Sequence, residues 1–82
     1  KSLVSIFPNP ADHELNILLN THLEQGFFIE FCDISGRIIY RNSIPNKLIH
    51  TIDVNNLKSG VYYLRFGNEK NNYLFHEKVM VL

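Results

Sequence analysis

Hydrophobic and polar residues alternate along most of this chain, in short runs that are typical of β-strands. The clearest run is ELNILLN at 14–20, where Leu15, Ile17 and Leu19 share one parity and polar asparagines take most of the other. A period of two residues is that of a strand with one face buried and one face solvated. The apolar run LVSIF at 3–7 precedes it. The pattern predicts two strands in the first quarter of the chain and no helix.

The same pattern continues to the end. Further runs are FFIEFCD (27–33), RIIYRNS (37–43), KLIHTIDV (47–54), GVYYLRF (60–66) and YLFHEKVMVL (73–82). The residues expected to face inward from them are Phe27, Ile29, Phe31, Leu48, Ile52, Val54, Tyr62, Leu64, Phe66, Phe75, Val79 and Val81. Turn clusters rich in Asn, Gly, Pro and Ser separate the runs. The expected fold is all-β, a small immunoglobulin-like antiparallel β-sandwich of about seven strands.

Length and composition narrow the function. At 82 residues and 45% hydrophobic, the chain is expected to form one folded unit, 1–82, with little room for a deep pocket. No apolar run approaches the roughly 18 residues that span a bilayer. Eight basic residues balance eight acidic ones, so no net charge would draw the chain to nucleic acid or to an anionic membrane surface. No direct membrane insertion is expected. No signal peptide is visible at Lys1. If the chain is exported, its targeting signal lies elsewhere or the chain is itself the targeting signal.

Candidate chemistry is sparse. The histidines, His13, His22, His50 and His76, are scattered, although a metal site assembled in space stays open. No Ser, His and Asp arrangement or glycine-rich phosphate loop is present. The lone Cys32 excludes an internal disulfide and a thiolate zinc site. We expect no enzymatic activity and no cofactor.

Two side-chain types leave alternatives open. Tyr63 and Tyr73 could stack on a sugar or a base, although core packing accounts for most of the aromatic residues. Cys32 has the outward parity of its run, beside Glu30. It is either a partly exposed thiol that dimerises on oxidation or a small semi-buried residue against a neighbouring strand.

Two prolines end the first run. Pro8 and Pro10 each fix φ and remove a backbone donor, so the first strand must stop at Phe7 and the chain must turn before Glu14. A further hypothesis is that the missing donors discourage pairing with another chain.

The order of the motifs carries more information than any single motif. FPNPADHELNI comes first, then IEFCDISGRII, then HTIDVNNLKSGVYYLRF, then HEKVMVL. This order resembles the type A C-terminal sorting domain of the type IX secretion system of Bacteroidota, over about residues 3–82. The residues that match the family motifs are Phe7, Pro8, Asn9, Pro10, Asp33, Gly36, Leu57, Gly60, Tyr62 and, in the closing strand, Lys78, Val79 and Val81. Cys32 departs from the family, which has an aromatic or aliphatic residue there, and the tail holds fewer lysines than is common.

The resemblance implies a function. A cargo domain would precede this segment, and the folded segment would be the signal that the type IX shuttle and outer-membrane translocon recognise after transit through the periplasm. A sortase-like peptidase would then remove the signal, and the cargo would be secreted or attached to lipopolysaccharide at the cell surface. The segment itself would catalyse nothing.

The contact surface is a separate expectation. We expect docking by β-augmentation at the final strand and its neighbour, with Lys78 as a contact and Gly60 needed for backbone shape. Edge strands and Cys32 also favour a weak dimer. The alternatives are a carbohydrate-binding module and a structural immunoglobulin-like spacer of a surface protein. A spacer would be followed by more chain, so whether the natural polypeptide stops at Leu82 would discriminate between them.

Overall fold

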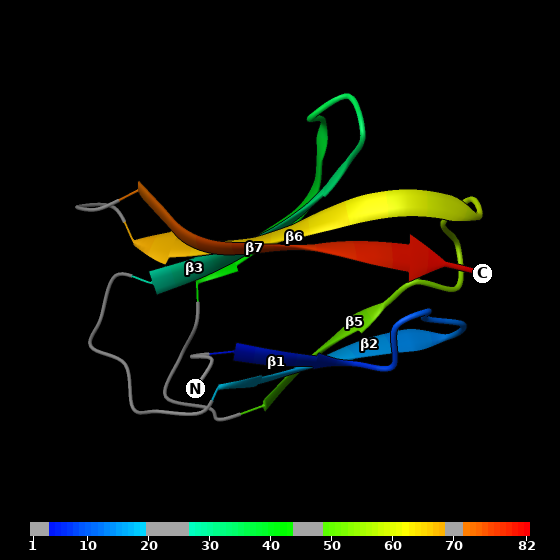
Figure 1. Cartoon of the computed structure of the whole chain (residues 1–82), viewed down its shortest axis with the longest axis horizontal. Coiled ribbons are helices and arrows are strands. Elements are labelled where there is room, and N and C mark those ends of the chain that lie inside the picture. The colour runs from blue at the N-terminus through cyan, green and yellow to red at the C-terminus, as the bar shows by residue number, and fades with distance from the viewer. Residues whose placement is uncertain (1–3, 20–26, 44–48, 69–71) are drawn as a thin grey trace.

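Seven antiparallel strands form two packed sheets in the computed structural model of the chain (Figure 1). The strands are β1 (Val4–Phe7), β2 (Glu14–Leu19), β3 (Phe27–Asp33), β4 (Ile38–Ser43), β5 (Ile49–Asp53), β6 (Gly60–Asn68) and β7 (Asn72–Val81). The structure describes residues 4–19, 27–43, 49–68 and 72–82, with the backbone alone at 72–74. All seven predicted runs are strands, and the expected β-sandwich is confirmed.

The two sheets form the two layers of the sandwich. The smaller sheet has the strand order β1-β2-β5, and the larger has the order β4-β3-β6-β7. Figure 1 shows the smaller sheet below the larger one, with the β3–β4 hairpin projecting away from the body of the larger sheet. The last strand, β7, is therefore an edge strand of the larger sheet, next to β6.

The core lies between the sheets and is built from the inward faces that the alternation predicts. Its largest fully buried side chains are those of Leu15, Ile17, Ile29, Phe31, Val54, Leu64, Phe66, Val79 and Val81. Phe27 and Phe75 are half-buried and pack against this cluster. Two stacked aromatic pairs, Phe27 with Phe66 and Phe31 with Tyr62, each with ring centroids 5.3 Å apart, join β3 to β6. Leu48, also predicted to face inward, lies outside the described residues.

The outer face of β3 is less solvated than its polar residues suggest. Phe28, Glu30 and Cys32 have the outward parity, yet all are buried, with Cys32 3% exposed. The interpretation of Cys32 as a partly exposed thiol is therefore wrong. The β3 strand lies in the interior of the larger sheet, between β4 and β6, so the residues on its outer face have a neighbouring strand on each side. No helix long and apolar enough to cross a membrane occurs within the described ranges.

Candidate recognition site

The Pro-Asn-Pro turn is bound to the end of the last strand. Asn9 Nδ2 donates to the Lys78 carbonyl oxygen over 2.9 Å, and the Met80 N–H donates to Asn9 Oδ1 over 3.0 Å. Both peptide bonds that precede the prolines are cis. Because proline has no N–H, the turn contacts β7 through the asparagine side chain instead. We call this pair of hydrogen bonds the Asn9 clamp.

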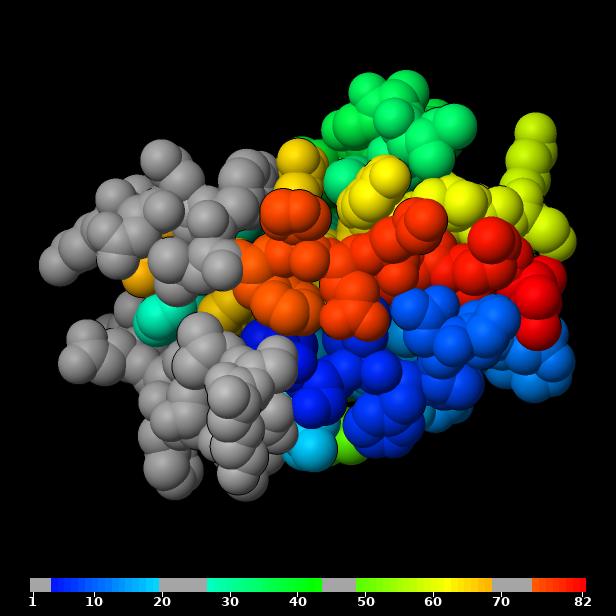
Figure 2. All heavy atoms as spheres, viewed as in Figure 1, coloured from blue at the N-terminus to red at the C-terminus, as the bar shows by residue number. Residues whose placement is uncertain are grey.

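Backbone bonds continue the clamp toward the C-terminal end of β7. The Ala11 N–H donates to the Met80 carbonyl over 2.7 Å, and the Leu82 N–H donates to the Ala11 carbonyl over 2.8 Å. Ala11 thereby forms an isolated parallel bridge with Val81, and its side chain is fully buried. Figure 2 shows the N-terminal segment, in blue, packed along the C-terminal strand, in red.

The clamp changes what the edge of β7 can offer a partner strand. From Lys78 to Leu82, two carbonyls and two N–H groups at this edge are already bonded to Asn9 and Ala11. Val79 and Val81 are buried in the core, whereas the Lys78 side chain is exposed. Side-chain contact through Lys78 is therefore available, but β-augmentation on this half of the strand first requires the clamp to open.

Asp33 organises the turn between β3 and β4. Its Oδ1 accepts hydrogen bonds from the Ser35 N–H (3.0 Å), the Ser35 hydroxyl (2.7 Å) and the Arg37 N–H (3.0 Å). Arg37 Nε lies 3.3 Å from Asp33 Oδ2. The hydrogen bond from the Ser35 hydroxyl is the main cause that lowers the pKa of Asp33. Gly36 takes φ +91°, a value that residues with a Cβ rarely adopt, and across this turn β3 and β4 pair as an antiparallel hairpin.

The Leu57–Tyr62 segment leads from β5 into β6. Gly60 has φ +150°, and no heavy atom of the described residues lies within 4 Å of where a Cβ would be, so backbone conformation alone favours glycine there. The Tyr62 hydroxyl donates to the Lys58 carbonyl over 2.7 Å. This bond closes the loop over the edge of the core, where Leu57 packs half-buried.

All four motif segments meet at one end of the sandwich. In the larger sheet, Asp33 pairs with Tyr62 and Tyr62 pairs with Val79, which makes one cross-strand row over β3, β6 and β7. Gly60 pairs with Val81 in the same ladder, and the Asn9 clamp holds the residues on either side of Val79. Motifs that are far apart in the sequence therefore form one continuous region.

A hollow of ≈ 450 Å³ lies at this end, between the Asp33 turn and the segment before β6. We call it the end hollow. Its apolar lining comes from Ile39, Leu57 and Tyr62. Its polar lining comes from Asp33, Arg37, Asn56 and Lys58.

A buried acidic residue on the outer face of the larger sheet is a feature that sequence reasoning missed. Glu30 is 3% exposed and lies opposite Arg41 on β4 and Arg65 on β6. Arg41 Nε is 2.9 Å from Glu30 Oε2, and Arg65 Nη2 is 3.2 Å from Oε1. The Arg41 guanidinium also lies 4.3 Å from the centre of the Phe28 ring. The sequence features that could have indicated this buried ion cluster are the single acid within the apolar run FFIEFC and an arginine on each of the two strands that pair with it.

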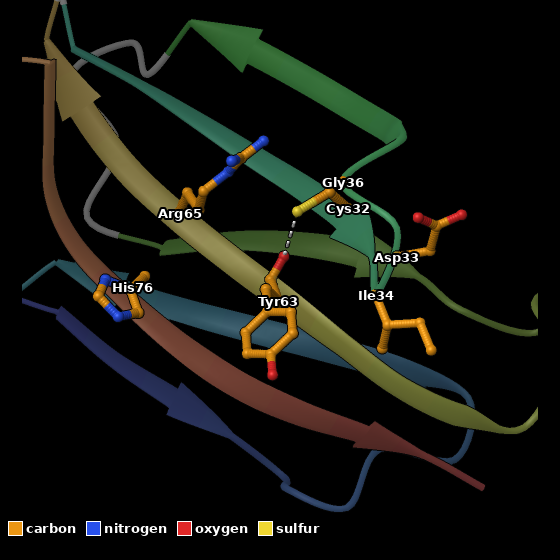
Figure 3. Close-up of a pocket in the computed structure, with 7 residues that line it drawn as sticks. All are labelled: Cys32, Asp33, Ile34, Gly36, Tyr63, Arg65 and His76. Carbon is orange, nitrogen blue, oxygen red and sulfur yellow. Dashed lines mark hydrogen bonds between the residues drawn. The ribbon is translucent and has the colours of Figure 1, made fainter.

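A shallow pocket of ≈ 200 Å³ lies beside this ion cluster, lined in part by Cys32, Tyr63, Arg65 and His76 (Figure 3). The Cys32 thiol lies 3.6 Å from the Tyr63 carbonyl oxygen, to which it donates, and burial is the main cause that raises its pKa. A thiol of this kind is a poor nucleophile, since the thiolate is the reactive form. Tyr63 is half-buried, and the Tyr73 side chain lies outside the described residues.

The three histidines that the structure describes lie on separate elements of the fold. His13 Nδ1 lies 2.8 Å from Asn55 Oδ1, and this hydrogen bond is the main cause that raises the pKa of His13. His50 is half-buried on β5 and His76 is exposed on β7, while His22 lies outside the described residues. Among those that are described, no three His, Cys, Asp or Glu side chains are placed to hold a metal ion.

Comparison with solved structures supports the architecture. A DUF3244 family protein from Bacteroides vulgatus, with an immunoglobulin-like β-sandwich fold, matches with a TM-score of 0.76, over 95% of this chain and 83% of that one. The sequence identity is 17%, so the likeness concerns the fold alone.

Comparison of sequences supplies the family. An endo-acting ulvan lyase from Formosa agariphila is 30% identical over 80 residues, which is 95% of this chain but 14% of the length of that protein. The lyase activity belongs to that protein as a whole. The model of the secretion system C-terminal sorting domain matches residues 5–81. That family consists of non-catalytic secretion signals, and the proteins that carry them are secreted or reach the cell surface. The match covers all four motif segments, and the chain belongs to the family of type IX secretion system C-terminal sorting domains.

Proposed function

We propose that residues 1–82 are a single sorting domain that follows a cargo domain in a larger protein and directs this cargo through the type IX translocon. The observation that carries the proposal is the family match over residues 5–81, whose motif residues gather at one end of the sandwich. The domain acts as a ligand and catalyses nothing. Shuttle components and the translocon bind it in the periplasm, and a sortase-like peptidase removes it, with release of the cargo or its attachment to lipopolysaccharide.

The recognition surface in this proposal is the motif end, with Lys78 as its exposed contact. The Lys78 side chain is exposed while its carbonyl holds the Asn9 clamp, so the ammonium group can engage a partner without disturbing the fold. The motif residues divide by role. Asn9, Asp33, Gly36, Gly60, Tyr62, Val79 and Val81 shape this end, and Lys78 is offered to the partner.

A reporter fusion tests the proposal. The reporter carries the chain at its C-terminus in a Bacteroidota host with a working type IX system, and its export is compared with that in a host lacking the system. We expect export to the medium or the cell surface only in the first host. Deleting residues from Lys78 onward is a poor control, because it removes Val79 and Val81 from the core. Lys78→Ala is the sharper variant, with the exposed Ser43→Ala on β4 as its control.

The outcomes separate the alternatives. Retention of a folded, stable fusion in the periplasm of both hosts would contradict the sorting function and leave the carbohydrate-binding or spacer interpretation, which glycan binding then tests. Export of the fusion with unchanged efficiency in the Lys78→Ala variant would leave the sorting function intact and reject Lys78 as a contact.

A further inference from the structure

The end hollow combines an apolar floor with a basic rim. Ile39 and Leu57 are half-buried and Tyr62 is 7% exposed. The Tyr62 ring stacks on Phe31 and its hydroxyl is bonded to the Lys58 carbonyl. The floor is therefore rigid, and the polar group of its tyrosine is already engaged. Carbon atoms of these three side chains line part of the hollow, and polar groups of Asp33, Arg37, Asn56 and Lys58 line the rest.

The rim has a net positive charge. Lys58 is exposed and the Arg37 side chain is 78% exposed. Among the described residues, Asp33 is the one acid that lines the hollow, and its Oδ1 accepts three hydrogen bonds within its own turn. Asp33 Oδ2 also lies 3.3 Å from Arg37 Nε, so the two cations and one carboxylate leave about one positive charge facing the opening.

From this arrangement we propose that the end hollow binds an acidic peptide segment of a partner protein, with an apolar side chain in the hollow and flanking carboxylates on Arg37 and Lys58. The volume of ≈ 450 Å³ has room for a large apolar side chain. The proposal rests on the sorting function and names the chemistry of the partner at the motif end. It also supplies a docking mode in which the Asn9 clamp stays closed, because the edge of β7 is not used.

Peptide titration followed by ¹H–¹⁵N NMR of the full chain tests the proposal. The probe is acetyl-Asp-Leu-Phe-Glu-amide, and its control is acetyl-Lys-Leu-Phe-Lys-amide, which keeps the apolar pair and reverses the charge. We expect saturable shifts of the Arg37, Ile39, Leu57 and Lys58 amides with the acidic peptide, with a Kd on the order of 1 mM, and none with the basic one. Equal shifts with both peptides, or no shifts at these amides, would overturn the proposal.

Variants on the rim sharpen the test. Arg37→Gln with Lys58→Gln is expected to weaken binding of the acidic peptide about tenfold, as two exposed ion pairs are lost. Ser43→Ala changes an exposed side chain on β4 that does not line the hollow and is expected to leave binding unchanged. Unchanged binding in the double variant, with its spectrum still that of a folded chain, would reject the basic rim as the binding group.

The reporter fusion distinguishes failure of this inference from failure of the sorting function. If the unmodified fusion is exported and the Arg37→Gln, Lys58→Gln fusion is exported equally well, the end hollow is not a docking site, whereas the sorting function stands. If the unmodified fusion is not exported, the sorting function fails whatever the peptide result. The inference predicts export of the unmodified fusion and retention of the double variant.

Discussion

Asn9 and Lys78 lie 69 positions apart in the sequence, yet the side-chain amide of one donates to the backbone carbonyl of the other over 2.9 Å. The same asparagine accepts a hydrogen bond from the Met80 N–H. One side chain thus satisfies a carbonyl and an N–H at the outer edge of the last strand, as a neighbouring strand would.

Asn9→Ala should lower the free energy of unfolding by about 1–2 kcal/mol, because two hydrogen bonds to the edge of β7 are lost. Amide hydrogen exchange at Met80 should accelerate more than at Leu64, which lies in the interior of the larger sheet. Asn56→Ala, at an exposed loop position, is the control and should change little in denaturant unfolding. Equal effects of the two substitutions would show that the clamp adds no stability.

In the ion cluster around Glu30, loss of an arginine should destabilise the fold more than loss of the acid. Arg65→Ala should lower the free energy of unfolding by about 2–3 kcal/mol, because the buried Glu30 carboxylate then loses one of its two ion pairs with arginine. Glu30→Met should lower the free energy of unfolding by less than about 1 kcal/mol, since the Arg41 and Arg65 side chains are 49% and 26% exposed and keep contact with water when the acid is gone. Urea unfolding of both variants checks this order. The reverse order would mean that the carboxylate stabilises the sheet beyond the cost of its burial.

The turn at Asp33 should make stability depend on acidity. The pKa of Asp33 is lower in the folded state than the ordinary aspartate value of about 3.9, chiefly through the Ser35 hydroxyl. Its stabilisation is therefore fully present above that ordinary value and is lost as the pH falls through the folded-state pKa. The difference in stability between the unmodified chain and Asp33→Asn should shrink as the pH is lowered. A difference that stays constant from neutral pH to pH values below the folded-state pKa would contradict the role of the charge.

The two glycines with positive φ should respond differently to asparagine. Gly36→Ala and Gly60→Ala should each cost about 1–3 kcal/mol through backbone strain, rather than through a clash, because a Cβ at either position would meet no heavy atom of the described residues within 4 Å. Asparagine tolerates the left-handed region near φ +60°, so Gly36→Asn should be milder than Gly36→Ala. At Gly60, with φ +150°, asparagine should give no such relief. Thermal unfolding of the four variants provides the comparison.

Cys32 should react slowly with a thiol reagent such as dithionitrobenzoate in the folded chain. Its burial and raised pKa both disfavour the exposed thiolate. Reaction should become fast in urea, and an oxidised dimer should form only under conditions that open the sheet. Fast stoichiometric reaction without denaturant would show that the outer face of β3 opens readily.

The strands of this fold are predictable from sequence because inward and outward residues alternate at period two in nearly every run. Leu15, Ile17 and Leu19 face the core as their spacing predicts. The turns are also readable, since Gly36 and Gly60 supply conformations that few other residues adopt. The prolines correctly mark the end of β1 at Phe7.

Contacts that depend on strand register could not be predicted in the same way. The burial of Glu30 follows from the placement of Arg41 and Arg65 on its two flanking strands, and alternation alone does not determine which residues face each other across a sheet. The Asn9 clamp needs the two ends of the chain side by side. The end hollow likewise depends on register, because the pairing of Asp33 with Tyr62 brings the β3–β4 turn beside the segment before β6.

The Asn9 clamp also determines the order in which parts of the fold can assemble. A chain that leaves a ribosome, or threads through a membrane channel, from its N-terminus delivers β7 after all the other strands. The Pro-Asn-Pro turn therefore has no hydrogen-bond partner on β7 until that strand has emerged, so the motif end is assembled after the other strands. A chain truncated before β7 would lack the Asn9 clamp, so the turn and the closing strand can be joined only after every other strand has been delivered.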